Sequence, residues 1–111
     1  MRVTDVRVWP VQGRHWPRFP MLFVEVYTDA GVVGLGESLC YKATGVLASI
    51  EQAGEYLVGK DPFRIELHWE TLYRSGLYPA ALSGIETALW DIVGPSGRPA
   101  DLQPARRAVP R

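Results

Sequence analysis

The spacing of apolar residues changes once along this chain, near Thr44, and this change restricts the fold more than any other feature of the sequence. Before it, apolar and polar residues alternate in segments such as "VTDVRVWPV", which is the period of a half-buried strand. After it, apolar residues recur at the spacing of amphipathic helices. Strands first and helices second favour an α+β fold over an alternating α/β fold.

Three strands are predicted between residues 2 and 38. The segment "MLFVEVYT" runs into "DAG", where Gly31 can take the positive φ of a short hairpin, and "VVGLGES" follows directly. A connection this tight makes the second and third strands antiparallel neighbours, and the longer loop "QGRHWPRFP" is expected to join the first strand to the same sheet. The sequence therefore predicts a three-stranded antiparallel meander.

About three helices are predicted after the meander. The first begins after Thr44 and ends before Gly59. The second has Asp61 as its N-cap and Pro62 at its first helical position, and the third spans about residues 80–93. The positions that these helices are expected to bury are Val46, Ile50, Ala53 and Leu57 in the first, Ile65, Trp69, Leu72 and Tyr73 in the second, and Leu82, Ile85, Leu89 and Ile92 in the third.

Composition excludes several classes of function. Lys and Arg together number 12, as do Asp and Glu, so the formal net charge is zero and no overall field attracts nucleic acid. The longest apolar run, residues 21–24, is too short to span a bilayer, and the N-terminus lacks the continuous apolar segment of a signal peptide. Cys40 is the only cysteine, which precludes an internal disulfide. We therefore expect a cytoplasmic protein with no membrane partner and no specific nucleic-acid partner.

No set of residues has the spacing of a catalytic or metal-binding group. The segment "GLGES" lacks the third glycine and the βαβ context of a dinucleotide site, and its glycines are better explained by close backbone approach or by a bulge in the third strand. Glu86 and Asp91 are not spaced to face each other on a helix as an acid and base pair. His68 is expected to be an exposed or half-buried helix histidine. No catalytic residue and no metal ligand is therefore predicted in this chain.

The loop "GRHWPRFP" is a candidate for ligand recognition. It brings two arginines, a histidine and a tryptophan together, and Arg with Trp suits an anionic or polyhydroxylated ligand. Loops held by a rigid sheet often carry such recognition groups. The alternative is a solvated loop whose Trp16 folds back on the core, and the sequence leaves both interpretations open.

Three consecutive motifs resemble those of a known family. They are "TDAGVVGLGES", "LVGKDPFRIELHWETLYR" and, most specific of the three, "ALSGIETALWDIVG". In this order they are similar to the N-terminal capping domain of the mandelate racemase and muconate lactonizing branch of the enolase superfamily, over about residues 2–94. The resemblance implies a parent enzyme, an acid-sugar dehydratase, racemase or cycloisomerase, in which a β/α barrel holds Mg²⁺ and removes a proton α to a substrate carboxylate.

The resemblance gives the capping domain itself a different task, which is to close the barrel mouth, exclude water and select the distal part of the substrate. The barrel's bases and magnesium ligands have no counterparts in this chain, so we expect the 111-residue chain to be inactive alone and to self-associate through the apolar surface that a barrel would cover. The resemblance assigns substrate selection to the loop after the first strand and to the segment after the third. The residues that these two segments offer are Arg14, His15, Trp16, Arg18, Tyr41 and Lys42.

Two other functions are consistent with the sequence. One is a freestanding ligand-binding or protein-interaction module, which would be monomeric or form one defined complex. The other is a small enzyme acting through Glu37, His15 or His68, which would need a convergent pocket that the spacings do not indicate.

Residues 95–111 depart from the family's pattern. They carry four prolines and four arginines without apolar periodicity, which is typical of a disordered segment. The codons allowed for "GPSGRPADLQPARRAVPR", read one base out of register, include "QAAGRPIYNLLGGPFR", which contains the linker and glycine pair that the family places before its barrel. We hypothesise that this tail arises from a frameshift next to Gly94. Coding DNA that does not spell the linker in the shifted frame would contradict this.

Overall fold

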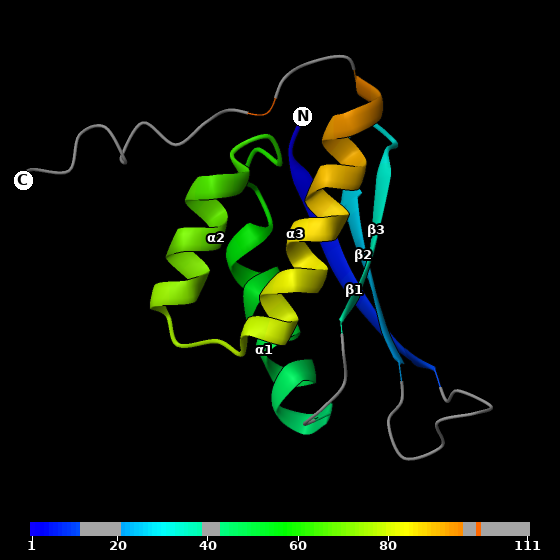
Figure 1. Cartoon of the computed structure of the whole chain (residues 1–111). Helices are drawn as coiled ribbons and strands as arrows, with labels where there is room; N and C mark the ends of the chain where they lie inside the picture. The colour runs from blue at the N-terminus through cyan, green and yellow to red at the C-terminus, as the bar shows by residue number, and fades with distance from the viewer. Residues whose placement is uncertain (12–20, 39–42, 97–99, 101–111) are drawn as a thin grey trace, which may run out of the picture.

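The alternating and helical patterns of the sequence are realised as three strands followed by three α-helices (Figure 1). The computed structural model describes residues 1–11, 21–38, 43–96 and 100 of the chain. This order confirms the predicted α+β class and the antiparallel meander. The elements are β1 (Val3–Val11), β2 (Met21–Thr28), β3 (Val33–Ser38), α1 (Ala43–Leu57), α2 (Ile65–Arg74), α3 (Pro79–Val93) and a short 3₁₀-helix, η1 (Gly94–Ser96).

The sheet has the strand order β1-β2-β3, and both neighbouring pairs are antiparallel. Gly31 closes the hairpin between β2 and β3 with a φ of 78°, as the sequence predicts. Val24 lies in the centre of the sheet, between Val8 on β1 and Gly36 on β3. Alternate residues of β2 are buried, because one face of the sheet packs against the helices.

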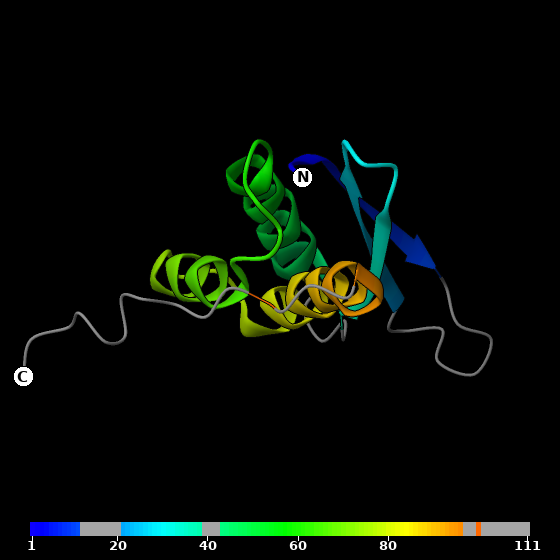
Figure 2. The same cartoon turned by 90° about the horizontal axis from the view of Figure 1, so that it is seen from above.

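All three helices lie on the same face of the sheet, as the view from above shows (Figure 2). Their apolar sides and the inner face of the sheet form one hydrophobic core. α3 lies along β3 at a distance that only glycine allows. A Cβ atom on Gly36 would overlap the carbonyl oxygen of Gly84 and lie 2.9 Å from the backbone nitrogen of Ala88. Close backbone approach, and not nucleotide binding, therefore accounts for the glycines of "GLGES".

α2 begins at Ile65, three residues later than the sequence predicts. Asp61 does not cap a helix. Its carboxylate accepts the N–H of Phe63 at 3.0 Å and so caps a turn that precedes α2. This turn inserts Phe63 into the core, where it is fully buried. The predicted N-cap at Asp61 and the helical Pro62 are therefore wrong.

The buried side of α2 also differs from the prediction. Ile65 and Leu72 are buried as expected, but the third buried residue is His68. Trp69 and Tyr73, which were expected to be buried, are exposed. The prediction failed because it assigned the aromatic residues to the core and left the polar imidazole outside.

Side chains block both edges of the sheet. On the β3 edge, the Asp91 carboxylate of α3 accepts the N–H of Leu35 at 2.8 Å. On the β1 edge, the Asp5 carboxylate accepts the N–H of Val6 at 2.9 Å, and Pro10 has no N–H to offer. Edge strands treated in this way are poor templates for pairing with another chain.

Little of the predicted tail falls within the described residues. Pro95 and Ser96 belong to η1, and Ala100 is half-buried against the hydrophobic core. Residues 97–99 and 101–111 lie outside the described part, and so do Cys40 and His15. No helix in the described part is long and apolar enough to cross a membrane.

Candidate functional site

Two connecting segments leave from the same end of the domain, which we call the loop end. It is defined by Val11 at the end of β1, Met21 at the start of β2 and Ser38 at the end of β3. Val11 pairs with Met21, and Leu22 pairs with Ser38, so the three strand ends are adjacent. α1 also begins at this end (Figure 1). Segments 12–20 and 39–42 are therefore anchored side by side.

The structure places the anchors of the substrate-specificity candidates but not the candidates themselves. The adjacent strand ends bring the two candidate segments together at their bases, as selection of one substrate by both segments requires. Their side-chain positions stay predictions. The six candidates that lie outside the described residues are Arg14, His15, Trp16, Arg18, Tyr41 and Lys42.

Tyr78 is a residue near the loop end that sequence reasoning missed. It directly precedes Pro79, the first residue of α3, and its N–H donates to the Ser49 hydroxyl of α1 at 3.1 Å. Its ring lies against Gly45 in the first turn of α1, where a Cβ would come within 2.8 Å of the phenolic oxygen. The side chain is nevertheless exposed and offers a hydroxyl and an aromatic face. The sequence feature that could have identified Tyr78 is its place directly before Pro79, because the residue before a proline is extended and lies at the start of the helix.

Ser38 ends β3 with a buried hydroxyl. Among the described residues, its Oγ has no hydrogen-bond partner. It lies against Gly84 of α3, where a Cβ atom would overlap it. The close packing of α3 on β3 therefore extends to the point at which segment 39–42 begins.

His68 is buried, which contradicts the expectation of an exposed or half-buried histidine. Its Nε2 lies 2.7 Å from the carbonyl oxygen of Asp61, and its Nδ1 lies 3.0 Å from the hydroxyl of Tyr56 on α1. The neutral ring satisfies both contacts by donating from Nε2 to Asp61 and accepting at Nδ1 from Tyr56. Burial lowers the pKa of His68, and the positive charges of Arg64 and Lys60 act in the same direction, while the Asp61 carbonyl opposes them. His68 thus joins α1 to α2.

The depressed pKa of His68 predicts a loss of stability in acid. The folded-state pKa lies below the ordinary value of 6.5, so the unfolded chain binds the proton more readily. This contribution to the free energy of unfolding is fully present above pH 6.5 and decreases as the pH falls through 6.5 toward the folded-state pKa. Urea unfolding at about pH 8 and about pH 5 measures it. The His68→Gln variant should show a smaller difference between the two pH values, and an equal difference in both proteins would contradict the assignment.

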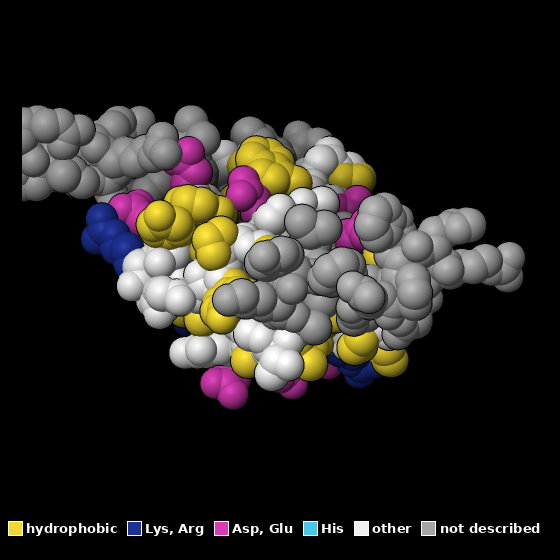
Figure 3. Space-filling view, turned by 60° about the horizontal axis from the view of Figure 1, so that its bottom comes forward, with side chains coloured by type: hydrophobic (Ala, Val, Ile, Leu, Met, Phe, Trp, Pro, Cys, Tyr) yellow, Lys and Arg dark blue, Asp and Glu magenta, His cyan; other side chains and the backbone are white. Residues whose placement is uncertain are grey.

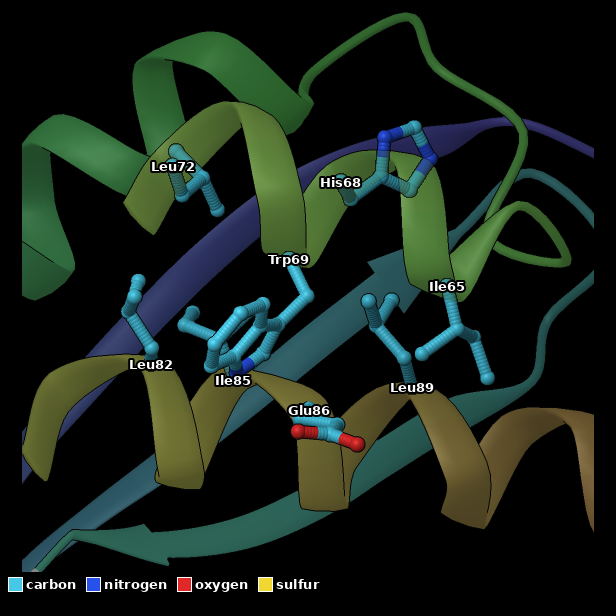
Figure 4. A pocket seen from close by; sticks show the side chains of 8 residues that line it. All are labelled: Ile65, His68, Trp69, Leu72, Leu82, Ile85, Glu86 and Leu89. Carbon is cyan, nitrogen blue, oxygen red and sulfur yellow. The ribbon is translucent and has the colours of Figure 1, made fainter. Parts of the chain in front are cut away.

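α2 and α3 meet in a narrow apolar groove (Figure 4). The indole of Trp69 lies across it toward Leu82 and Ile85 of α3. The described residues contain no group of three or more His, Cys, Asp or Glu side chains that could hold a metal ion. Glu86 and Asp91 serve separate contacts, with Trp90 Nε1 and Leu35 N respectively, so they do not form an acid and base pair. The residues that line the groove are Ile65, His68, Trp69, Leu72, Leu82, Ile85, Glu86 and Leu89.

Residues 9–99 match the family model described as mandelate racemase / muconate lactonizing enzyme, N-terminal domain. The chain is 38% identical over 101 residues to D-galactonate dehydratase of Klebsiella pneumoniae, an alignment that covers 85% of this chain and 25% of that protein. It is 44% identical over 101 residues to D-galactonate dehydratase of Cronobacter sakazakii, with the same coverage. The chain thus spans about a quarter of the length of these relatives.

Solved structures show the same architecture. The 3,6-anhydro-D-galactonate cycloisomerase of Zobellia galactanivorans superimposes with a TM-score of 0.75 at 26% identity, over 86% of this chain and 29% of that one. The dipeptide epimerase of Enterococcus faecalis V583 superimposes with a TM-score of 0.74 at 27% identity, over 86% of this chain and 30% of that one. In both comparisons the matched part is a minority of a longer chain.

Proposed function

This chain belongs to the mandelate racemase / muconate lactonizing enzyme family as its N-terminal domain, and from that premise we propose that it acts as the capping and substrate-specificity domain of a sugar-acid dehydratase. In this role it closes the mouth of a catalytic β/α barrel and selects the distal part of a carboxylate substrate. The chemistry of the whole enzyme is the Mg²⁺-dependent removal of a proton α to that carboxylate. The chain alone is inactive.

The observation that carries this proposal is the shared anchoring of segments 12–20 and 39–42 at the loop end. Two segments that start from adjacent strand ends can contact one ligand from two sides, while the sheet and α3 keep their bases fixed. The sugar-acid preference is supported by the two D-galactonate dehydratases, which are 38% and 44% identical to the chain. Racemases and cycloisomerases of the same family are the alternatives that the substrate assay separates.

The described residues do not fit a magnesium site, because no three of their His, Cys, Asp or Glu side chains group together. No step of the reaction is therefore assigned to them. Magnesium, when bound to the parent enzyme, stabilises the negative charge of the deprotonated substrate. The contribution of this chain is selection of the substrate and exclusion of water.

Within the two segments, we assign charge recognition to Arg14, Arg18 and Lys42. Their cationic groups suit the hydroxyl-rich or anionic end of a sugar acid, and arginine binds carboxylate with paired hydrogen bonds. Trp16 and Tyr41 supply aromatic faces that suit the apolar face of a sugar ring. His15 completes the set as a hydrogen-bond donor or acceptor.

The test uses two proteins. One is the 111-residue chain, and the other is a chimera in which residues 1–94 replace the matched N-terminal quarter of the Klebsiella dehydratase. With Mg²⁺ and a panel of sugar acids, we expect turnover only from the chimera. In the chimera, Arg14→Met or Arg18→Met should lower kcat/KM about tenfold to a hundredfold, because each removes hydrogen bonds to a charged or polar ligand group.

The matched control is Arg74→Met, which removes an exposed arginine that pairs with Glu70 on α2. It should leave kcat/KM of the chimera unchanged. Turnover by the isolated chain would contradict the proposal. Equal kcat/KM values for the Arg14, Arg18 and Arg74 variants would contradict the assignment of these segments to substrate selection.

A further inference from the structure

An exposed strip of aromatic side chains crosses α2 and α3 on the side away from the sheet. We call Tyr73, Trp69 and Trp90 the aromatic strip. Tyr73 is 53% exposed, Trp69 38% and Trp90 48%. The apolar residues that both helices bury lie at other positions. Three large aromatic side chains exposed on two adjacent helices are typical of an interaction surface.

Contacts within the domain hold two of the three rings of the strip. The rings of Trp69 and Tyr73 stack at a centroid distance of 4.9 Å with an interplanar angle of 12°. Trp69 is also held over the groove between the helices, where it lines the same surface as Glu86 (Figure 4). Rigid aromatic anchors of this kind lose little conformational entropy on binding.

Glu86 gives the strip a charge preference. Glu86 of α3 lines the same groove as Trp69 of α2, and its carboxylate accepts a long contact from Trp90 Nε1, at 3.4 Å. A partner that covers the strip must therefore provide a cation or several N–H donors to this carboxylate, or its desolvation would be unfavourable.

The outer face of the sheet also exposes large apolar side chains, from all three strands, but its central carboxylate differs from that of the strip. Trp9 is as exposed as Trp90, at 49%, but its indole N–H already donates to the carboxylate of Glu25. The Tyr27 hydroxyl donates to the same carboxylate at 3.0 Å. The carboxylate of Glu25 at the centre of that face is thus satisfied within the domain, and both sheet edges are blocked by Asp5 and Asp91.

Figure 3 shows that exposed hydrophobic side chains also lie beside acidic ones when the domain is seen from the loop end.

We propose that the aromatic strip is the docking surface for the catalytic domain of the parent enzyme, which meets Glu86 with a basic side chain. The inference rests on the proposed function, because it takes the occupant to be the three quarters of each relative that lie beyond the matched quarter. Ala100, six residues after Gly94 at the C-terminal cap of α3, packs against the core that the helices share, and Trp90 of α3 is exposed. In the longer relatives, the part beyond the matched quarter would follow the helix that presents the strip.

Hydroxyl-radical footprinting tests this, because it measures the oxidation rate of each aromatic side chain separately. Trp9 and Trp90 provide a matched pair, since they are 49% and 48% exposed in this chain and should oxidise at similar rates when it is alone. In the chimera with the Klebsiella dehydratase, Trp90, Trp69 and Tyr73 should oxidise about fivefold more slowly while Trp9 is unchanged, because side chains at an interface core lose water contact. Unchanged strip rates, or protection of Trp9 in place of Trp90, would overturn the proposal.

A charge variant tests the role of Glu86. In the chimera, Glu86→Arg should return the oxidation rate of Trp90 toward that of the isolated chain, because two cations would face each other across the interface. Glu55→Arg reverses an exposed charge on α1 and should have no such effect. Equal effects of the two variants would contradict the assignment. Protection of the strip that grows with the concentration of the isolated chain and is absent in the chimera would identify a second copy as the occupant, and would also overturn the proposal.

The two proposals fail separately. Turnover by the chimera reports on the proposed function, whereas footprinting reports on docking. A protected strip in an inactive chimera supports docking and contradicts the sugar-acid assignment, while an active chimera with an unprotected strip does the reverse. If the chimera does not fold, the intact Klebsiella enzyme is compared with its own N-terminal quarter, at the outward-facing positions of its second and third helices.

Discussion

The Gly36→Ala variant is expected to lose about 3 kcal/mol of its free energy of unfolding, a large share of what a domain of this size possesses. The added methyl group would overlap the carbonyl oxygen of Gly84 and lie 2.9 Å from the nitrogen of Ala88. Both atoms belong to the backbone of α3, so neither can rotate away, and the helix must move off the sheet. Denaturant unfolding followed by circular dichroism measures the loss.

Gly94→Ala is the matched control for this substitution. Gly94 follows α3, has a φ of −55°, and has no atom within 4 Å of the position of an added Cβ. Alanine there should leave stability unchanged or raise it by about 0.5 kcal/mol, because it restricts the unfolded chain. Equal stabilities of the two alanine variants would contradict the close packing of α3 against β3.

The Phe63→Ala variant is expected to lose about 3–5 kcal/mol of the free energy of unfolding. Phe63 is the largest fully buried side chain in the described part of the chain, and it enters the core from the turn between α1 and α2. Its removal leaves a cavity and frees the turn that Asp61 caps. The shift in the denaturant midpoint, at an unchanged slope, measures the loss.

Phe63→Leu separates the cavity from the turn. Leucine keeps most of the buried volume, so this variant should lose about 1 kcal/mol if packing is what Phe63 contributes. The same loss in both variants would contradict that interpretation.

The sheet was predictable from the sequence because its determinants are local. The alternation in "MLFVEVYT" and the glycine of "DAG" specify a strand and a hairpin without reference to distant residues, and both are found as β2 and the turn at Gly31. Close backbone approach at the glycines of β3 was one of the two explanations that the sequence offered, and the packing of α3 confirms it. The backbone partners of these glycines, Gly84 and Ala88, became known only from the packing.

The second helix was predicted less well because its determinants are tertiary. Asp61 followed by Pro62 is a common start for a helix, yet here it forms a turn, since Phe63 gains more by entering the core than by continuing a helix. His68 could be buried only because Tyr56 and the carbonyl of Asp61 satisfy both ring nitrogens. Neither partner can be identified from spacing along the chain.

The substrate-selection role of segments 12–20 and 39–42 stays a prediction, because both segments lie outside the described residues. The resemblance to the family indicated the two segments, and the strand register shows that their bases are adjacent. Tyr78 was missed because its place beside α1 depends on how α3 packs against Gly45. Trp69 and Tyr73 were assigned to the core because aromatic residues at helical spacing usually belong there, whereas both are exposed in the domain.

The anchoring of segments 12–20 and 39–42 at one end of the sheet also bears on how such proteins change during evolution and in the laboratory. The determinants of folding described above, including Gly36, Phe63 and His68, lie in the strands, the helices and the turn between α1 and α2, outside both segments. Mutations in the segments can therefore accumulate without a large loss of stability, since loops tolerate replacement better than a packed core. A library randomised only in these two segments is a suitable starting point for selecting new ligand preferences.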